Sequence, residues 1–337
     1  AMAHLFMLET DDPLVTVPDV LAYNLYFGWY LGELADNDTW LDEFRTEHPG
    51  VAIGLSEYGA DANFRVQTGN PTRGDYSEQF QAAYHDHMID LIEARPWLWC
   101  TYVWNLADFG ADARDEGGVA GRNQKGLVTF DRSVKKDAFY AYRAAWSSEP
   151  FVHVAGRRYA DRPEEATDVT VYSNQGEIEL YVDDELHGAA TGRRVFRFQV
   201  PLTGEHRITA RCGDLADTIT VRRVDEPNPD YALAVAPITN WFDTVELARP
   251  DGFLSIYDTM AEIKSVPEAR PLIDEFMQRA ATARGDVAQD VEIPESMQEI
   301  VDRMTVATLL KYAGAIMTPD DVQTLNTSLN AIPKPRS

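Results

Sequence analysis

The first 147 residues alternate short apolar runs with segments of helical periodicity. Four of the runs have the length and composition of buried strands: residues 4–8, 19–30, 51–59 and 97–109. Two segments between them, residues 37–48 and 75–95, place apolar residues along one helical face. Strands that alternate with helices are typical of parallel β/α units, so this part is predicted to be an α/β domain.

The helix predicted at residues 75–95 has a recognisable start. Asp75 stands three residues before Glu78, which is the spacing of a capping box. The predicted apolar face of this helix has seven members: Tyr76, Phe80, Ala83, Tyr84, Met88, Leu91 and Ile92. We therefore expect one buried side and one solvated side.

The pattern changes at about residue 148. Up to residue 226, short segments with a period of two are separated by turns that contain glycine. Phe196, Phe198 and Val200 are predicted to face one way, and Arg197 and Gln199 the other. This pattern predicts a small antiparallel β-sandwich of immunoglobulin-like size.

The C-terminal part is predicted to be a small helical domain. Residues 227–250 follow a proline-rich start and are expected to form a linker. Residues 251–337 are expected to hold four helices, near 252–266, 268–284, 295–314 and 318–332. Thr318 and Pro319 suit the cap and first turn of the last helix. The predicted fold class is therefore multi-domain, with α/β, β and α parts.

Composition excludes two classes of partner. The net charge is −25, from 55 acidic and 30 basic residues. Nucleic acids and anionic membranes require a basic surface, so neither is an expected partner. No apolar run reaches the roughly 18 residues of a membrane-spanning helix. Two distant cysteines, Cys100 and Cys212, are typical of free thiols in a reducing compartment, which favours a cytoplasmic protein.

Candidate chemistry gathers where the predicted strands end. Glu57 lies at the carboxyl end of the strand at residues 51–59, where parallel α/β enzymes collect catalytic groups. Aromatic and amide side chains follow the neighbouring strands: Asn24, Tyr26, Trp29, Tyr30, Tyr58, Trp104, Asn105 and Asp108. Aromatic faces stack on sugar rings, and amides and phenols bind hydroxyls. Glu57 alone is more often a helix-capping residue, but these neighbours favour a carbohydrate pocket.

These motifs resemble the second half of the catalytic barrel of glycoside hydrolase family 2. The segments YNLYFGWY, SEYG and VWNLADF are similar to its sixth, seventh and eighth strands, and the resemblance extends through GRNQKGLVTFDR to about residue 147. It implies strands five to eight of a (β/α)8 barrel, with Glu57 as the nucleophile. Asn24, Tyr26 and Tyr58 are expected to hold that carboxylate, and Trp104 to bind substrate.

The resemblance also implies that one catalytic group lies outside this chain. Family members retain anomeric configuration through two carboxylates about 5–5.5 Å apart. The acid/base Glu of the family follows an Asn at the end of the fourth strand, and no such Asn-Glu pair precedes residue 4. Glu9, Asp61 and Glu116 lack the required context. We therefore expect an inactive chain that pairs with the missing N-terminal barrel half or with a second subunit.

A short loop motif bears on the substrate. Asn123 and Lys125 lie two residues apart in GRNQKG, which resembles the Asn-x-Lys motif with which β-glucuronidases hold the sugar carboxylate. Tyr30 matches a tyrosine near that carboxylate. An ammonium group and an amide suit a carboxylate ligand, although a solvated turn has the same composition. A terminal β-glucuronide is the first expectation; a β-galactosidase and a non-catalytic interaction module are the alternatives.

Other motifs predict no further chemistry. His85 and His87 are two residues apart on a helix and point to different faces, which is poor geometry for a metal. Residues 114–118, RDEGG, lack the ligand spacing of a calcium loop. There is no phosphate-binding glycine loop. No cofactor and no metal are therefore expected.

Overall fold

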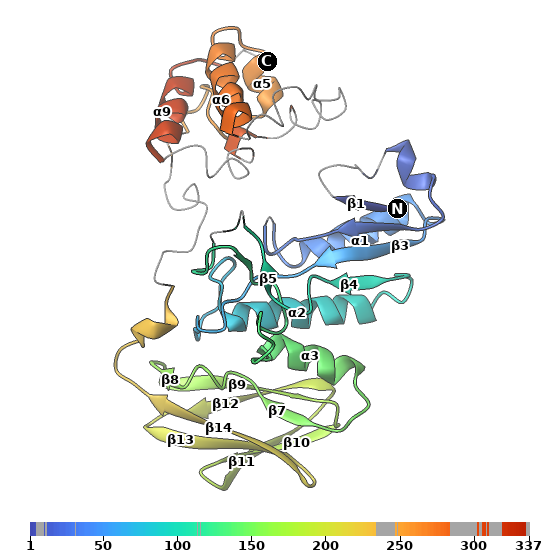
Figure 1. The fold of residues 1–337 in the computed structure, drawn as a ribbon, viewed down its shortest axis with the longest axis vertical. Coiled ribbons are helices and arrows are strands. Elements are labelled where there is room, and N and C mark those ends of the chain that lie inside the picture. The colour runs from blue at the N-terminus through green and yellow to red at the C-terminus, as the bar shows by residue number, and fades with distance from the viewer. Residues whose placement is uncertain are drawn as a thin grey trace. The chain divides into compact units, whose positions relative to one another are not determined.

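The protein divides into two compact units, residues 1–238 and residues 239–337, and each is described by itself. The structure is a computed structural model. It describes residues 1–4, 10, 12–30, 32–112, 114, 116–233, 247, 249–283, 302, 305–307, 309 and 319–334. Figure 1 draws the first unit from blue to yellow and the second from orange to red.

The N-terminal part of the first unit is a parallel sheet with helices. The strands are β1 (Met2–His4), β2 (Leu21–Asn24), β3 (Ile53–Tyr58) and β4 (Thr101–Val103), and they pair in this order. The helices are α1 (Asp36–Glu47), α2 (Glu78–Glu93) and α3 (Asp137–Trp146), after a 3-10 turn at Pro13–Thr16. The predicted parallel β/α pattern is confirmed. The described strands form an open sheet and not a closed barrel.

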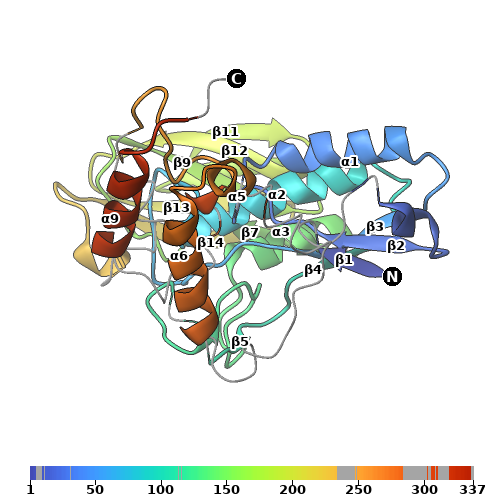
Figure 2. The same ribbon diagram turned by 90° about the horizontal axis from the view of Figure 1, so that it is seen from above.

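One face of this sheet packs against α1 and α2 (Figure 2). Tyr23 of β2 meets the rings of Trp40 and Phe44 of α1 at centroid distances of 4.8 and 5.8 Å. Tyr58 of β3 lies 6.2 Å from the ring of His85 of α2. These contacts belong to the main hydrophobic core of the unit. Of the predicted strand at residues 4–8, residues 5–8 lie outside the described part.

The start of α2 differs from the prediction. Its N-cap is Ser77, whose Oγ accepts a hydrogen bond from Phe80 N at 3.0 Å. Asp75 instead accepts from the backbone of Thr72 and Ser77 and stabilises the preceding turn. Asp75 and Ser77 are two residues apart, so either side chain was a candidate for the cap. Only the Ser77 hydroxyl group reaches the backbone N–H of the third helical residue, Phe80.

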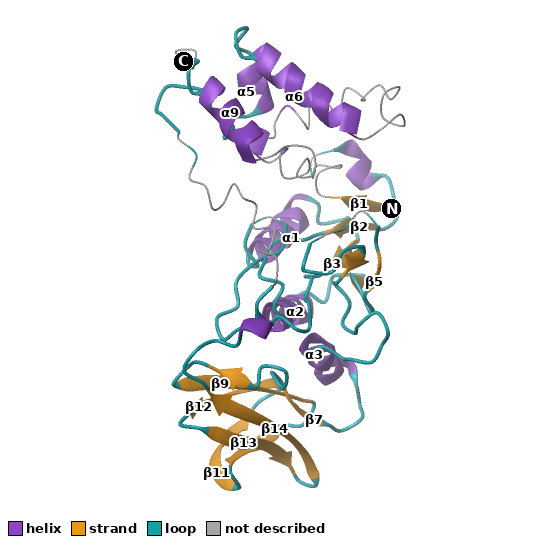
Figure 3. Ribbon diagram, turned by 60° about the vertical axis from the view of Figure 1, so that its left-hand side comes forward, coloured by secondary structure: helices purple, strands orange, loops and turns teal. Residues whose placement is uncertain are grey.

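The predicted solvated side of α2 was also wrong. Ala83, expected on the apolar face, is exposed, whereas Gln81, His85 and Asp86 are buried. The reason is that α2 is covered by the sheet on one side and by α3 and the next domain on the other (Figure 3). His85 bonds the Tyr142 hydroxyl group, and His87 pairs with Asp38, so the two histidines do face different partners.

Residues 152–223 form two packed sheets. One sheet has the order β12 (Arg194–Pro201), β9 (Ala166–Ser173), β7 (Val152–Val154). The other has the order β11 (Glu185–Thr191), β10 (Glu177–Val182), β13 (Glu205–Cys212), β14 (Leu215–Arg223), β8 (Asp161–Arg162). Apolar residues of both sheets share one core. Phe196 and Val200 are buried in it and Arg197 and Gln199 are exposed, as the alternation predicts.

Charged side chains join this β domain to α2. Arg158 binds Glu78, which is fully buried at the first turn of α2, and its Nε lies 2.7 Å from Glu78 Oε2. Asp86 accepts bonds from the Tyr172 hydroxyl group of β9 and from Arg197 of β12, both at 3.2 Å. Burial raises the pKa of Asp86 to about 6, against the opposing effect of Arg197. The β domain therefore packs against α2 and helps to bury this side of the α/β domain.

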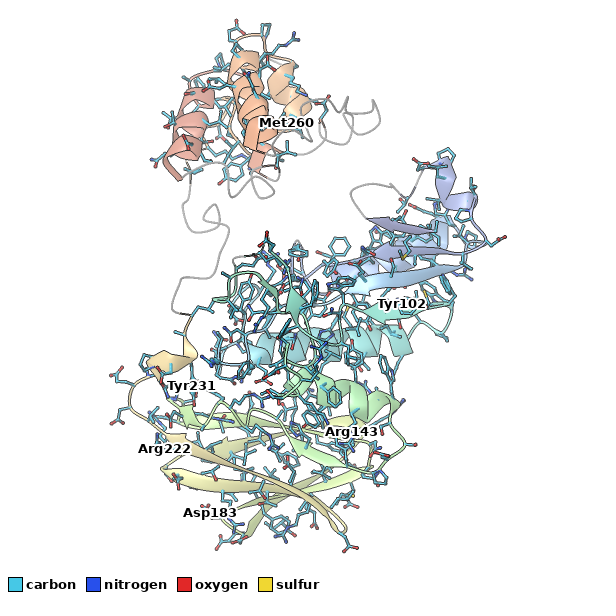
Figure 4. The ribbon with its side chains drawn as sticks, viewed as in Figure 1. Tyr102, Arg143, Asp183, Arg222, Tyr231 and Met260 are labelled. Atoms are coloured by element: carbon cyan, nitrogen blue, oxygen red, sulfur yellow. The ribbon has the colours of Figure 1, made fainter. Side chains whose placement is uncertain are left out.

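The predicted linker begins with ordered structure. A 3-10 turn at Pro229–Tyr231 packs on the β domain, beside which Figure 4 shows Tyr231. The Tyr231 hydroxyl group accepts from the backbone N–H groups of Ala160 and Asp161 at 3.1 and 3.2 Å. Residues 234–246 lie outside the described part, as do most of the residues of the helix predicted at 295–314.

The second unit is helical where it is described. It contains α5 (Met260–Lys264), α6 (Arg270–Ala283) and α9 (Pro319–Leu329) around a small apolar core. Thr259 and Glu262 form a complete capping box at the start of α5. None of the described helices is long and apolar enough to cross a membrane. Cys100 and Cys212 in the first unit are both free thiols.

A buried lysine ties together the loops that follow the strands. Lys136 is 0% exposed, and its Nζ donates to Ala62 O at 2.7 Å, Gln124 O at 2.8 Å and Asp108 Oδ1 at 2.9 Å. All three of its protons are therefore used. Burial lowers the pKa of Lys136, and the charge of Asp108 opposes that shift.

We expect Lys136→Met to lower the free energy of unfolding by about 3–5 kcal/mol, because it leaves the buried Asp108 carboxylate without its cation. Urea unfolding followed by circular dichroism measures the change. The neighbouring Lys135 is exposed, so Lys135→Met is the matched control and should stay within about 0.5 kcal/mol. Equal effects of the two variants would contradict the role given to Lys136.

Candidate functional site

Glu57 lies at the carboxyl end of β3, half-buried among the strand ends. Its backbone carbonyl accepts a bond from Leu25 N at 2.9 Å, and β2 pairs Asn24 with Glu57 in register. The Tyr26 hydroxyl group donates to Glu57 Oε2 at 2.8 Å. Burial and the charge of Glu57 raise the pKa of Tyr26 above its ordinary value, so this phenol stays protonated and remains a donor.

The other two residues expected to hold Glu57 have different partners. Asn24 Oδ1 accepts from Ser56 Oγ at 2.7 Å. Tyr58 is fully buried, and its hydroxyl group bonds with that of Tyr142 at 3.2 Å. Successive residues of a strand point to opposite faces, so Glu57 and Tyr58 are on different sides of the sheet. The structure brings Tyr26 to the carboxylate and places Tyr58 in the core.

The strand end turns sharply at Gly59. A Cβ atom there would lie 2.1 Å from the carbonyl oxygen of Trp104, the residue that follows β4 by one position. Trp104 N bonds Tyr58 O at 2.8 Å, so the two backbone segments are held at this separation. The peptide bond between Trp104 and Asn105 is cis. Trp104 is partly buried, and its ring meets that of Phe109 edge-on at 5.8 Å.

A second group of side chains surrounds Lys125, which is 1% exposed. Its Nζ donates to the Tyr30 hydroxyl group at 2.6 Å and to Asp61 Oδ2. It also lies 4.5 Å from the ring centroid of Tyr30 and 5.7 Å from those of Tyr26 and Trp29. This cation is therefore enclosed by aromatic faces and one carboxylate, and is not the solvated lysine of an open turn.

Asp61 and Arg114 complete the group. Burial would raise the pKa of Asp61, but Lys125 and Arg114 together hold it below its ordinary value. Arg114 Nη1 lies 3.0 Å from Asp61 Oδ1, and Nη2 donates to the Tyr30 hydroxyl group. Glu116 pairs with Arg114 Nε at 3.3 Å. Asp61 and Glu116 are thus ion-pair partners in the structure, and Glu9 lies outside the described residues.

Asn123 is held so that its amide nitrogen is available. Its Oδ1 accepts from Lys125 N at 3.0 Å, which fixes the side chain within its own loop and leaves the Nδ2 group as its remaining donor. The residue is buried beside Lys125, in the short strand β6 (Arg122–Asn123) that pairs with β5 (Phe109–Gly110).

Tyr26 connects the two groups. Its hydroxyl group bonds Glu57, while its ring packs 5.1 Å from the Tyr30 ring and near Lys125. The arrangement therefore offers a carboxylate with a phenol donor next to a cation with a second phenol. Asn105 and Asp108 lie outside this arrangement. The backbone of Asn105 bonds Lys125 O at 3.3 Å and Leu127 N at 3.0 Å, and Asp108 is a buried partner of Lys136 and of Gly126 N. Sequence reasoning missed Arg114, because a single arginine in a loop has no distinguishing pattern.

The chain is similar to several known glycosidases over part of its length. No protein-family model matches the chain. Over 179 residues, 51% of this chain, it is 39% identical to a β-glucuronidase of Bacteroides fragilis. It superposes on a solved FMN-binding β-glucuronidase of Faecalibacterium prausnitzii L2-6 with 46% identity over 66% of this chain and a TM-score of 0.65.

The chain is thus similar to proteins named β-glucuronidase over about half its length. It spans 26% of the length of the B. fragilis β-glucuronidase and 35% of the F. prausnitzii one. A solved protein of B. fragilis named as a putative β-galactosidase is 33% identical over 67% of this chain and 36% of its own, with a TM-score of 0.62.

One solved relative is named with its ligand. It is β-glucuronidase 2 of Bacteroides uniformis, covalently bound to cyclophellitol-6-carboxylate aziridine. It is 30% identical over 63% of this chain and 27% of its own, with a TM-score of 0.57.

We expect Gly59→Ala to destabilise the protein, because the new Cβ would overlap a backbone carbonyl that cannot rotate away. Roughly 2 kcal/mol or more of unfolding free energy should be lost. Gly50→Ala is the control, since Gly50 is exposed and has no atom near its Cβ position. Differential scanning calorimetry measures both. A Gly59→Ala protein as stable as the Gly50→Ala protein would refute the close approach of Trp104.

Proposed function

We propose that this chain forms part of a retaining exo-β-glycosidase that hydrolyses terminal β-glucuronides, with Glu57 as its nucleophile. The observation that carries the proposal is the link through Tyr26 between Glu57 and the Lys125 cation. In a hexuronic acid the ring oxygen bonds the anomeric carbon on one side and, on the other, the carbon that bears the carboxylate. A site for such a sugar needs a nucleophile and a cation on neighbouring sides of one ring.

The proposed reaction is a double displacement. The Glu57 carboxylate attacks the anomeric carbon while a second carboxylic acid protonates the leaving oxygen, and water then hydrolyses the glycosyl–enzyme bond with the second group as base. The Tyr26 hydroxyl group holds Oε2 of the nucleophile through its 2.8 Å bond. The covalently bound B. uniformis relative supports a nucleophile in this family. No step requires a flavin.

In this proposal Tyr30, Asn123 and Lys125 recognise the sugar carboxylate. Tyr30 is 45% exposed and is the outward member, while Lys125 supplies charge behind it. Asn123 offers its amide nitrogen. The carboxylate carried by the inhibitor in the B. uniformis structure is consistent with such recognition in a relative.

The second carboxylate is proposed to come from an N-terminal barrel half or a second subunit. Within the described residues β1 and β4 each pair on one side only, so two strand edges are open. Tyr102 of β4 is 58% exposed, which suits a strand that another segment covers. In the experiments below, the parent enzyme means this chain together with that barrel segment.

We expect Glu57→Gln to lower kcat of the parent enzyme on 4-nitrophenyl β-D-glucuronide by roughly 10³-fold or more, because an amide cannot form the glycosyl ester. Release of nitrophenol measures the rate. Glu47→Gln, an exposed residue at the end of α1, is the control and should keep wild-type activity. Substantial turnover by Glu57→Gln would mean that another residue is the nucleophile.

Lys125→Ala decides between the glucuronide and the galactoside. We expect kcat/KM on the glucuronide to fall by roughly 10–100-fold relative to that on the galactoside, since a charge-assisted contact is lost. Efficient hydrolysis of the galactoside that Lys125→Ala leaves intact would instead favour a β-galactosidase, the second candidate supported by the B. fragilis structure. Absence of both activities in the parent enzyme would favour a non-catalytic module.

A further inference from the structure

Arg114 has a role in this site that its position in the sequence does not reveal. It lies in the loop between β5 and β6, yet its guanidinium binds Asp61 after β3 and the Tyr30 hydroxyl group after β2. Segments that follow three different strands therefore meet at one side chain. The planar group suits this task, because its donors are fixed in a fork.

The bonds at the Tyr30 oxygen determine where its proton points. A phenol hydroxyl group both accepts and donates hydrogen bonds. Lys125 Nζ and Arg114 Nη2 both donate to the Tyr30 oxygen. Lysine and arginine have no acceptor atom, so the O–H proton of Tyr30 is left for a third group. Tyr30 is the half-exposed member of the cluster, so that group approaches from outside it.

The local charges lead to the same conclusion. Lys125 and Arg114 contribute two positive charges, and Asp61 and Glu116, which form ion pairs with them, contribute two negative ones. The group is balanced with Arg114 present. Without Arg114 it would carry one net negative charge next to Glu57, which would repel an anionic sugar.

We propose that Arg114 is a specificity-determining residue that directs the Tyr30 hydroxyl proton toward the carboxylate of a hexuronic acid and keeps the pocket from becoming anionic. The inference rests on the proposed function and adds a residue outside the Asn-x-Lys motif. Arg114 acts through Tyr30 and through charge, so it should affect the choice between acidic and neutral sugars more than the chemical step.

The test compares two substrates that differ only at C6, the 4-nitrophenyl β-D-glucuronide and the β-D-glucoside. In the parent enzyme, Arg114→Gln should lower the glucuronide-to-glucoside ratio of kcat/KM by roughly 10–100-fold. Most of the glucuronide loss should appear in KM. Arg114→Lys retains the charge and should recover part of the ratio. Arg122→Gln, at the start of β6 and stacked on Phe130, is the charge-matched control and should leave the ratio within about threefold.

A ratio unchanged by Arg114→Gln, or one lowered equally by Arg122→Gln, would overturn the inference while the proposed function stands. If the parent enzyme hydrolyses neither sugar, the proposed function fails and calorimetric binding decides the inference separately. The 337-residue chain would be titrated with sodium D-glucuronate and with D-glucose. Weaker glucuronate binding by Arg114→Gln than by Arg122→Gln supports the inference, and equal binding overturns it.

Discussion

The bonds of the Lys136 ammonium group are the constraint on which the candidate site depends. They join the segment after β3, the segment after β4 and the loop that carries Lys125. A buried ammonium group is costly unless every proton finds an acceptor, so the three segments can hardly move independently. The segments that carry or adjoin Glu57, Trp104 and Lys125 therefore have a common support. Such support under loops that bear functional groups is what a rigid substrate site requires.

Much of the α/β part was predictable because its strands and helices have distinct periods. The strands at 51–59 and 97–109 and the helix at 75–95 all appear in the structure, although each is shorter than predicted. The side of α2 that contacts the β domain was not predictable. Its polar residues Gln81, His85 and Asp86 are buried by partners that come from distant parts of the chain. Amphipathic periodicity assumes that one face meets water, and here no broad face does.

The contacts of individual site residues depend on three-dimensional positions, which the periodicity of the sequence predicts only in part. The pairing of Glu57 with Tyr26 joins residues 31 positions apart, and the strand ends predicted that they would be close. Tyr58 was predicted to lie in the pocket because it is next to Glu57 in the sequence. Successive residues of a strand point to opposite faces, so its side chain lies on the other face of the sheet. Lys125 was predicted as a cation for a carboxylate, and the structure adds that Asp61, Arg114 and three aromatic rings already surround it.

The join between α2 and the β domain limits how this protein can be divided or recombined. Glu78 and Asp86 are acidic residues of α2, but their cations, Arg158 and Arg197, belong to the next domain. A chimera that exchanges domains at residue 148 would leave these carboxylates buried without a cation, unless the new domain supplies equivalent arginines. The sequence pattern changes at about residue 148, but buried ion pairs cross this position. A change at Glu78 or Asp86 of α2 therefore requires a matching change at its arginine partner in the β domain.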